Sequence, residues 1–227
     1  LAEIYQVKLQ KKELEIEQRD IKLNMLANQM NPHFLFNALE TIRMKAHSRG
    51  ESELAQIVKT LGKLLRRNLE AGSELTTVED ELELVTGYLE IQKFRFGDKL
   101  EYRIKVAEET KNFALLPLTI QPLVENAVVH GLEQKEDKGR VWIEVFRSGP
   151  YLSILVRDDG VGMSAAEVES VRSLLAEEKN HKHIGLKNLQ QRLKLFYGEG
   201  YGLKITSQLY QGTEVEIRLP WRGGSDV

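Results

Sequence analysis

The segment Gln29–Asn37 (QMNPHFLFN) places a histidine in the first turn after a proline. A neutral imidazole nitrogen is a competent nucleophile near neutral pH, so His33 could act as one. Asn37 lies four residues later on the same face of the expected helix, where its amide could position a water or a phosphoryl group. Since a lone histidine more often caps or packs a helix, the residues by themselves leave both interpretations open.

A second set of polar residues interrupts the apolar segment Gln121–Gly131 (QPLVENAVVHG). Asn126 and His130 are four residues apart and therefore share one helix face. A carboxamide oxygen is a hard ligand that suits Mg²⁺, with phosphate oxygens and waters completing the octahedron. Placing Glu125 and Asn126 in an apolar helix is costly unless they face a cleft. The alternative is a core helix with a polar edge.

The third set, Asp158–Met163 (DDGVGM), directly follows an apolar strand. Gly160 and Gly162 imitate part of a dinucleotide-binding fingerprint. We reject that interpretation because two adjacent aspartates would lie against a pyrophosphate, and because the neighbouring strands are expected to form hairpins. An aspartate beside a glycine turn can instead accept a hydrogen bond from the exocyclic amine of adenine, while the glycines let the backbone approach the base. A plain β-turn is the alternative.

The fourth set, His183–Asn188 (HIGLKN), lies where a polar loop over 178–185 meets the start of a helix. Backbone N–H groups at a helix N-terminus bind phosphate, and Lys187 could add positive charge. The loop would then act as a lid over a nucleotide. The chain contains no Walker A sequence, which excludes a P-loop.

The elements that must position these four sets divide the chain into two parts. Residues 1–70 carry 12 basic and 9 acidic side chains, a net charge of 12 − 9 = +3. Residues 71–227 carry 20 basic and 25 acidic side chains, a net charge of 20 − 25 = −5, and glycine or proline recurs there every few residues. This composition predicts a helical first part and a mixed α/β second part.

Residues 1–30 contain neither glycine nor proline and are rich in good helix formers. Apolar residues recur at heptad spacing, which favours a coiled coil with a second copy of the chain over a single amphipathic helix. Asn31-Pro32 interrupts this pattern, and residues 31–72 are predicted to form a helical hairpin with its turn near Arg49-Gly50. Dimerisation into a four-helix bundle would cover its wide apolar stripe.

Residues 73–222 are predicted to form an α+β two-layer sandwich, and 223–227 a polar tail. Thr76 and Glu79 form a capping-box pattern before a helix that ends near Gly97. Further helices are expected over 118–130, 165–177 and 186–197. Alternating apolar residues and turn signals predict the strands, which are expected over 100–106, 140–147, 151–157, 202–209 and 213–219.

The overall composition excludes several classes of protein. The 227 residues include 32 basic and 34 acidic side chains, a net charge of −2, which argues against a nucleic-acid binder. The absence of cysteine excludes disulfides, a thiolate nucleophile and thiolate zinc sites. No run of about 18 apolar residues is present, so no membrane-spanning segment is predicted.

The four sets in this order resemble the LytS/YesM-type sensor histidine kinases of bacterial two-component systems. QMNPHFLFN resembles the phosphoacceptor segment, QPLVENAVVHG the N box, and DDGVGM and IGLKNL the two glycine boxes. The resemblance implies a GHKL (Bergerat) ATP-binding sandwich that follows a coiled-coil signalling helix and a dimeric phosphotransfer hairpin. It also implies that His33 accepts the γ-phosphoryl group of ATP, with Asn37 as a possible positioning residue.

The resemblance implies roles for the other residues as well. Asn126, with Glu125 as a possible second ligand, would hold Mg²⁺, and Asp158 would bind adenine. The full set expected to bind ATP is Asn126, His130, Asp158, Gly160, Gly162, Gly185, Leu186, Lys187, Asn188 and Thr213. A homodimer and the receiver domain of a response regulator are the implied partners. The chain, which begins at Leu1, is expected to be a cytoplasmic fragment of a bacterial inner-membrane sensor.

Two alternatives to a kinase stay open. A dimeric ATP-binding relay without kinase chemistry is suggested by Val129, where many kinases have a basic residue, and by His183, where the second glycine box often begins with glycine. Phe34 also follows the histidine where other classes have an acidic residue. A GHKL ATPase, in which Glu125 activates water, is the other alternative.

Overall fold

The computed structural model describes residues 32–70, 75–176 and 184–221. The predicted coiled coil over 1–30 and the polar tail over 223–227 lie outside these residues, as does most of the expected lid. The chain divides into two compact units at Leu69–Glu70. No helix of the described ranges has the length and apolar character needed to cross a bilayer.

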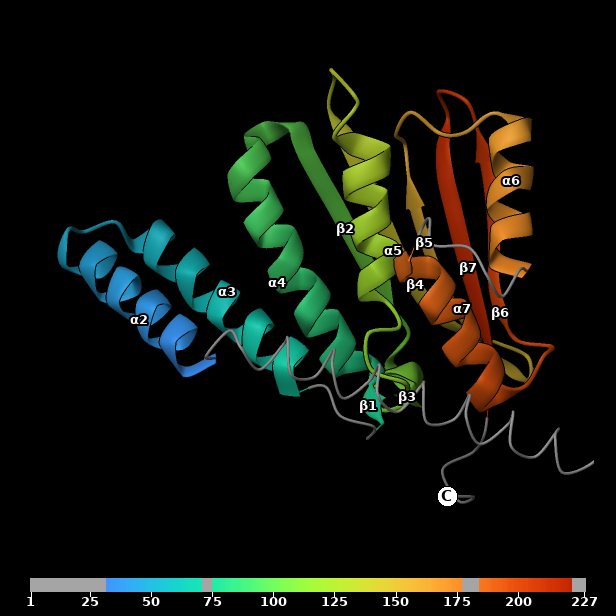
Figure 1. The fold of residues 1–227 in the computed structure, drawn as a ribbon, viewed down its shortest axis with the longest axis horizontal. Helices are drawn as coiled ribbons and strands as arrows, with labels where there is room; N and C mark the ends of the chain where they lie inside the picture. Colours follow the sequence, from blue (N-terminus) through green and yellow to red (C-terminus); the bar gives the residue numbers. More distant parts are fainter. Residues whose placement is uncertain (1–31, 71–74, 177–183, 222–227) are drawn as a thin grey trace, which may run out of the picture. The chain divides into compact units, whose positions relative to one another are not determined.

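The first unit is a helical hairpin of α2 (Pro32–Ser48) and α3 (Ser52–Glu70), drawn in blue to teal in Figure 1. Gly50 has a φ of 78°, a left-handed conformation that glycine adopts at little cost, and the chain reverses there. The turn therefore lies where the sequence predicts it. Ala46, Ala55, Val58 and Leu64 are buried in this unit, whereas several larger apolar side chains stay exposed.

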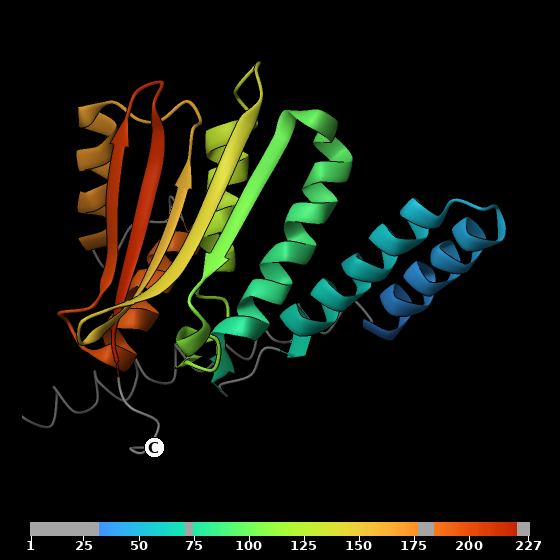
Figure 2. The ribbon, with the colours of Figure 1, turned by 180° about the vertical axis from the view of Figure 1, so that it is seen from behind.

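The second unit has a mixed sheet with helices on one face (Figures 1 and 2). Within the described residues the sheet has five strands in the order β2-β4-β5-β7-β6. Their bounds are β2 Leu100–Val106, β4 Gly139–Ser148, β5 Tyr151–Asp158, β6 Gly202–Gln208 and β7 Gly212–Pro220. The helices are α4 Val78–Phe96, α5 Gln121–Asn126, α6 Ala165–Ala176 and α7 Ile184–Tyr197. This arrangement confirms the α+β two-layer prediction.

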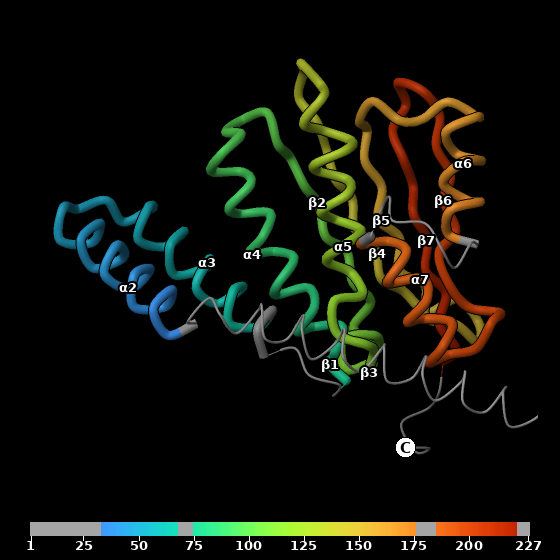
Figure 3. Tube along the Cα trace, in the orientation of Figure 1, coloured from blue at the N-terminus to red at the C-terminus, as the bar shows by residue number. Residues whose placement is uncertain are grey.

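The strand pairing is mostly antiparallel, as the hairpin signals predict. Strand β5 pairs antiparallel with both β4 and β7, which excludes a parallel βαβ unit around Asp158. Strands β2 and β4 are parallel, which the sequence analysis does not predict. Parallel neighbours need a long crossover connection, and Figure 3 shows the chain passing from β2 through α5 to β4.

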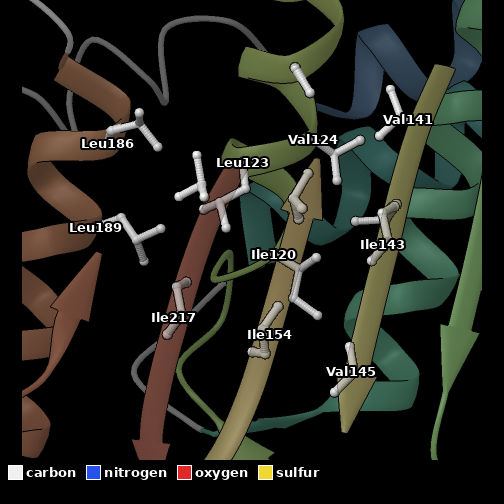
Figure 4. Packing of buried hydrophobic residues seen from close by; sticks show 14 of the residues in the cluster. Ile120, Leu123, Val124, Val141, Ile143, Val145, Ile154, Leu186, Leu189 and Ile217 are labelled. Carbon is white, nitrogen blue, oxygen red and sulfur yellow. The ribbon is translucent and has the colours of Figure 1, made fainter. Parts of the chain in front are cut away.

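The core lies between the sheet and the helices (Figure 4). Alternate residues of the strands point toward the helices because side chains alternate across a sheet, as Val141, Ile143 and Val145 of β4 do. Buried residues of α5 and α7, such as Leu123 and Leu189, pack against them. This core fixes α5, β5 and α7 relative to one another.

The start of α4 differs from the prediction by one residue. Thr76 pairs with Leu115 in the short β1 (Thr76–Thr77) and β3 (Ala114–Leu115) ladder, so the helix cap falls on Thr77. Asp80 N donates to Thr77 Oγ1 at 3.1 Å, and Asp80 Oδ2 in turn accepts from Thr77 N at 3.4 Å. The capping box is therefore Thr77 with Asp80, because strand pairing delays the helix.

The helix expected over 118–130 also differs in its bounds and form. It begins at Gln121, and after α5 it continues as the π-helical segment η3 (Ala127–Leu132). Leu118 has a φ of 57° and is therefore not part of the helix. Two short 3₁₀ turns, η1 (Gly97–Lys99) and η2 (Glu108–Thr110), complete the unit.

Candidate functional site

A cavity opens between the Gln121–Leu132 helix, the end of β5 and the start of α7. Its empty volume is about 620 Å³, part of it open to solvent. Most of its lining is apolar, and the polar residues that line it are Asn126, His130, Asp158 and Thr213. An apolar pocket with a few placed polar groups is the usual form of a small-molecule site.

Asp158 is the buried acid of this cavity, with 3% of its surface exposed. The N–H groups of Gly160 and Thr213 donate to its Oδ1 at 2.8 and 3.3 Å. Burial raises the pKa of Asp158 to about 6, and these two N–H groups oppose the rise only in part. Since both donors reach Oδ1, Oδ2 is the oxygen that can accept a hydrogen bond from a ligand.

Glycines let three backbone segments meet around Asp158. A Cβ atom on Gly160 would collide with the carbonyl of Gly131, and one on Gly162 with the carbonyl of Gln208. Gly162 also has a φ of 61°, which a side chain rarely adopts. Gly162 lines the cavity, whereas Gly160 is not among the lining residues and contributes the N–H that holds Asp158.

Asn126 and His130 both line the cavity, as four-residue spacing predicts. Asn126 Nδ2 donates to the carbonyl of Pro122 at 2.5 Å, which fixes the amide and leaves Oδ1 as its acceptor. Glu125 is not among the lining residues, and its Oε1 accepts from Gln121 Nε2 at 2.7 Å. The π-helical turn that follows Asn126 is of a kind often found at functional sites.

The start of α7 brings only part of the second glycine-box segment to the cavity. The helix begins at Ile184, so the predicted phosphate-binding residues lie in its first turn and a half. Leu186 lines the cavity, whereas Gly185, Lys187 and Asn188 are not among the lining residues. Lys187, which the sequence suggests as a source of positive charge, is buried, with 7% of its surface exposed.

The two adjacent aspartates after β5 have different surroundings. Asp159 accepts from the backbone N–H of Arg140 at 2.7 Å and lies 3.1 Å from Lys135 Nζ. These contacts tie the start of β4 to the loop after η3. Asp159 is therefore a structural residue, and only Asp158 faces the cavity.

Ser207 of β6 supports the cavity, and the sequence analysis does not identify it. Its Oγ accepts from Met163 N at 2.9 Å, donates to the carbonyl of Gly212 at 2.8 Å and lies 2.9 Å from Thr213 Oγ1. It thus joins the loop after β5 to the start of β7. The sequence around Ser207 does not predict these hydrogen bonds, because Met163 is distant in sequence and a serine in an alternating strand is common.

His33 and Asn37 belong to the first unit, near the start of α2. Both are exposed, and Asn37 Nδ2 lies 3.3 Å from His33 Nδ1. The expected four-residue contact is therefore present, and the donor and acceptor roles follow the tautomer of His33. The ring of His33 is thus exposed on the surface of α2.

Comparisons with protein families match two regions of the chain. Residues 21–100 match the histidine kinase family, and residues 114–223 match the family described as histidine kinase-, DNA gyrase B-, and HSP90-like ATPase. The second match covers the strands and helices that surround the cavity. The first covers His33 and Asn37.

Similar curated proteins are sensor kinases. The chain is 34% identical to sensor histidine kinase YesM of Bacillus subtilis, over 90% of this chain and 34% of the relative. It is 37% identical to sensor histidine kinase BtsS of Escherichia coli, over 97% of this chain and 37% of the relative. The chain thus spans little more than a third of the length of these relatives.

A solved structure shares the fold. The nucleotide-free catalytic domain of histidine kinase ThkA aligns with a TM-score of 0.50 and 12% identity, over 66% of this chain and 97% of that domain. The chain therefore belongs to the sensor histidine kinase family, with the histidine of its phosphoacceptor-like segment in the helical hairpin and an ATPase-family region in its α+β unit.

Proposed function

We propose that the chain is the kinase core of a two-component sensor, in which ATP phosphorylates His33 and the phosphoryl group then passes to an aspartate of a receiver domain. The observation that carries this proposal is the buried Asp158 in an apolar cavity, within a region that matches an ATPase family. The match of residues 21–100 to the histidine kinase family supports His33 as the acceptor.

The cavity suits the adenine base. Apolar side chains such as Leu123, Val156 and Ile205 line it and can contact the faces of a flat ring. Asp158 Oδ2 would accept a hydrogen bond from the exocyclic amine, and the ionised carboxylate is the stronger acceptor for this contact. Thr213, whose N–H reaches Asp158, lies beside this contact.

The N-box residues suit the phosphate end of the nucleotide. Asn126 Oδ1 is a hard oxygen ligand, held in place because the amide nitrogen bonds to Pro122. As the one protein ligand, Asn126 would suit a Mg²⁺ ion whose other ligands are phosphate oxygens and waters. When bound, Mg²⁺ neutralises charge on the phosphate oxygens.

We assign this role to Asn126 and contact with phosphate to the exposed His130. Glu125 accepts from Gln121 through Oε1 and is not among the lining residues, so we do not include it in the proposed site. Leu186 lines the cavity, which supports a contact between this residue and the nucleotide. Gly185, Lys187 and Asn188 stay predicted phosphate-binding residues.

Phosphoryl transfer to His33 needs mainly positioning and charge neutralisation. The lone pair of a neutral ring nitrogen forms the N–P bond while the bond from the γ-phosphorus to the bridging oxygen breaks, and ADP leaves with that electron pair. Asn37, in contact with the ring, would orient it. The phosphohistidine is then the donor for the carboxylate of the regulator.

A homodimer is the assembly that the hairpin favours. Phe34, Ile42, Met44 and Leu61 are large apolar side chains that are exposed on α2 and α3. A second hairpin would cover them in a four-helix bundle. The exposed His33 would stay accessible to a receiver domain in that arrangement.

Labelling with γ-labelled ATP and Mg²⁺ tests the kinase. The unaltered chain should acquire an acid-labile, alkali-stable label, and His33→Gln should acquire none while it still binds ATP. His47→Gln, which alters another exposed histidine of α2, is the matched control and should label normally. Equal labelling of His33→Gln would contradict the proposal. Phosphate release that survives His33→Gln and is lost in Glu125→Gln would support an ATPase instead.

A further inference from the structure

Glu81 is a buried carboxylate on α4, outside the motifs considered above. Its side chain is among the largest that are fully buried, with 1% of the residue exposed. Its Oε1 accepts from Leu118 N at 2.7 Å, and its Oε2 accepts from Thr119 N and Ile120 N, both at 2.9 Å. Burial raises the pKa of Glu81, and these N–H groups oppose the rise. Three backbone donors thus converge on one acid.

The segment that Glu81 holds leads directly into the helix of Asn126. Leu118 has a φ of 57°, and left-handed backbone of this kind turns successive N–H groups toward one point. The carbonyl of Ile120 then accepts from Leu123 N at 3.1 Å and from Val124 N at 3.3 Å. The contacts of Glu81 therefore fix the first turn of α5.

Asn126 is fixed to that same turn. Its Nδ2 bonds to the carbonyl of Pro122, the second residue of α5. A continuous series of contacts thus runs from Glu81 through Ile120 and the first turn to the amide of Asn126. Groups that orient a metal ligand commonly affect metal affinity about 10–100-fold when they are altered.

We infer that Glu81 is a positioning residue for the magnesium–phosphate end of the nucleotide site, acting through the first turn of α5 on Asn126. This inference rests on the proposed function. The acid at the adenine end is held by other groups, because Asp158 belongs to β5 and accepts from the N–H groups of Gly160 and Thr213, although Leu123 of α5 also lines the cavity. A change at Glu81 should therefore weaken the binding of MgATP much more than the binding of adenosine.

The test compares two ligands in the Glu81→Gln variant. Adenosine reports the adenine end, and ATP with Mg²⁺ reports both ends. Glutamine has one acceptor oxygen in place of two, so at least one N–H of the 118–120 segment loses its partner. We expect adenosine affinity within about twofold of the unaltered chain, and MgATP affinity and the rate of His33 labelling about 10–100-fold lower.

Asp80→Asn is the matched control. It weakens the cap of α4 one residue away, so it destabilises the same helix while Glu81 keeps its three donors. Asp80→Asn should therefore change the affinities for adenosine and for MgATP little. If Glu81→Gln does not bind adenosine because it fails to fold, Glu81→Asp, which keeps the charge but shortens the side chain, takes its place with the same expectation.

Equal losses for adenosine and MgATP, or no loss for either, would overturn the positioning role. A failure of the proposed function gives a different result. In that case the unaltered chain itself would show no gain in affinity from Mg²⁺ and phosphates and no label on His33, and the role of Glu81 would fall with it.

Discussion

Gly131 packs directly against the carboxylate of Asp158, so that a Cβ atom at residue 131 would lie 2.6 Å from Asp158 Oδ1. The carbonyl of Gly131 also accepts from Val161 N at 3.0 Å. The end of the N-box helix and the loop after β5 thus meet without a side chain between them. The acid that we assign to adenine is held in place partly by a residue of the segment that we assign to phosphate.

Gly131→Ala should displace the Asp158 carboxylate, because the added methyl group has no room. We expect the affinity for adenosine to fall at least about tenfold and the free energy of unfolding to fall by about 1–3 kcal/mol, as is typical of overpacking. Calorimetry with adenosine and thermal unfolding measure the two effects. Gly200→Ala, where a Cβ meets nothing within 4 Å, is the control. Unchanged adenosine affinity in Gly131→Ala would contradict the contact.

Asp158→Asn should abolish nucleotide binding yet stabilise the unliganded protein above pH 6. Burial raises the folded-state pKa of Asp158 to about 6, above the unfolded value near 4. The ionised carboxylate therefore lowers the free energy of unfolding as the pH rises from about 4 to about 6, and this loss stays constant at higher pH. An asparagine keeps an oxygen for Gly160 N and carries no charge. The gain should be on the order of 1–3 kcal/mol at pH 8 and should vanish below the unfolded pKa, near pH 4.

Unfolding measured from pH 4 to pH 8 checks this prediction. Asp159→Asn is the comparison, since Asp159 bonds to Arg140 N and Lys135 at the partly exposed edge of the same loop. It should destabilise the protein near neutral pH. A stability gain for Asp158→Asn that did not depend on pH would show that the charge of Asp158 is not its cause.

Adenosine affinity should itself depend on pH through Asp158. The ionised carboxylate is the stronger acceptor for the exocyclic amine, so binding should be nearly constant above about pH 7 and should weaken below the pKa near 6, by at most about tenfold per pH unit. Adenosine is the right probe because it carries no phosphate to titrate or to contact His130. The His130→Gln variant should give the same profile, and a profile that shifted with this variant would assign the titration to the histidine.

Ser207→Ala should weaken the support behind the cavity. Met163 N would lose the hydroxyl that it now bonds to, and an unpartnered half-buried N–H costs about 1–3 kcal/mol. We expect a loss of stability in that range and a fall of a few-fold in adenosine affinity, since Thr213 also loses a neighbour. Thr206→Ala, an exposed neighbour on the other face of β6, should change stability by no more than about 0.5 kcal/mol. Equal effects of the two variants would show that the Ser207 contacts are unimportant.

Local patterns predicted most elements of the α+β unit. Alternation identified the strand Leu100–Val106 with its observed bounds, and Gly97 marked the end of α4. The prediction failed by one residue at Thr77, where pairing of Thr76 with Leu115 displaced the helix cap. The prediction also missed the parallel pairing of β2 with β4. The alternation of apolar and polar residues indicates a strand but does not indicate which strand lies beside it.

Local spacing and motif order also identified some of the residues that face the cavity. Asn126 and His130 share a helix face by spacing alone, and the order of the motifs indicated Asp158. The sequence by itself determined the types of chemistry available and the local elements that carry them. The tertiary structure decided that Lys187 is buried, that Glu81 holds the start of α5 and that Ser207 supports the cavity. These three features depend on contacts between segments that are far apart in the chain. Strand order and packing determine such contacts, and a local sequence pattern does not predict them.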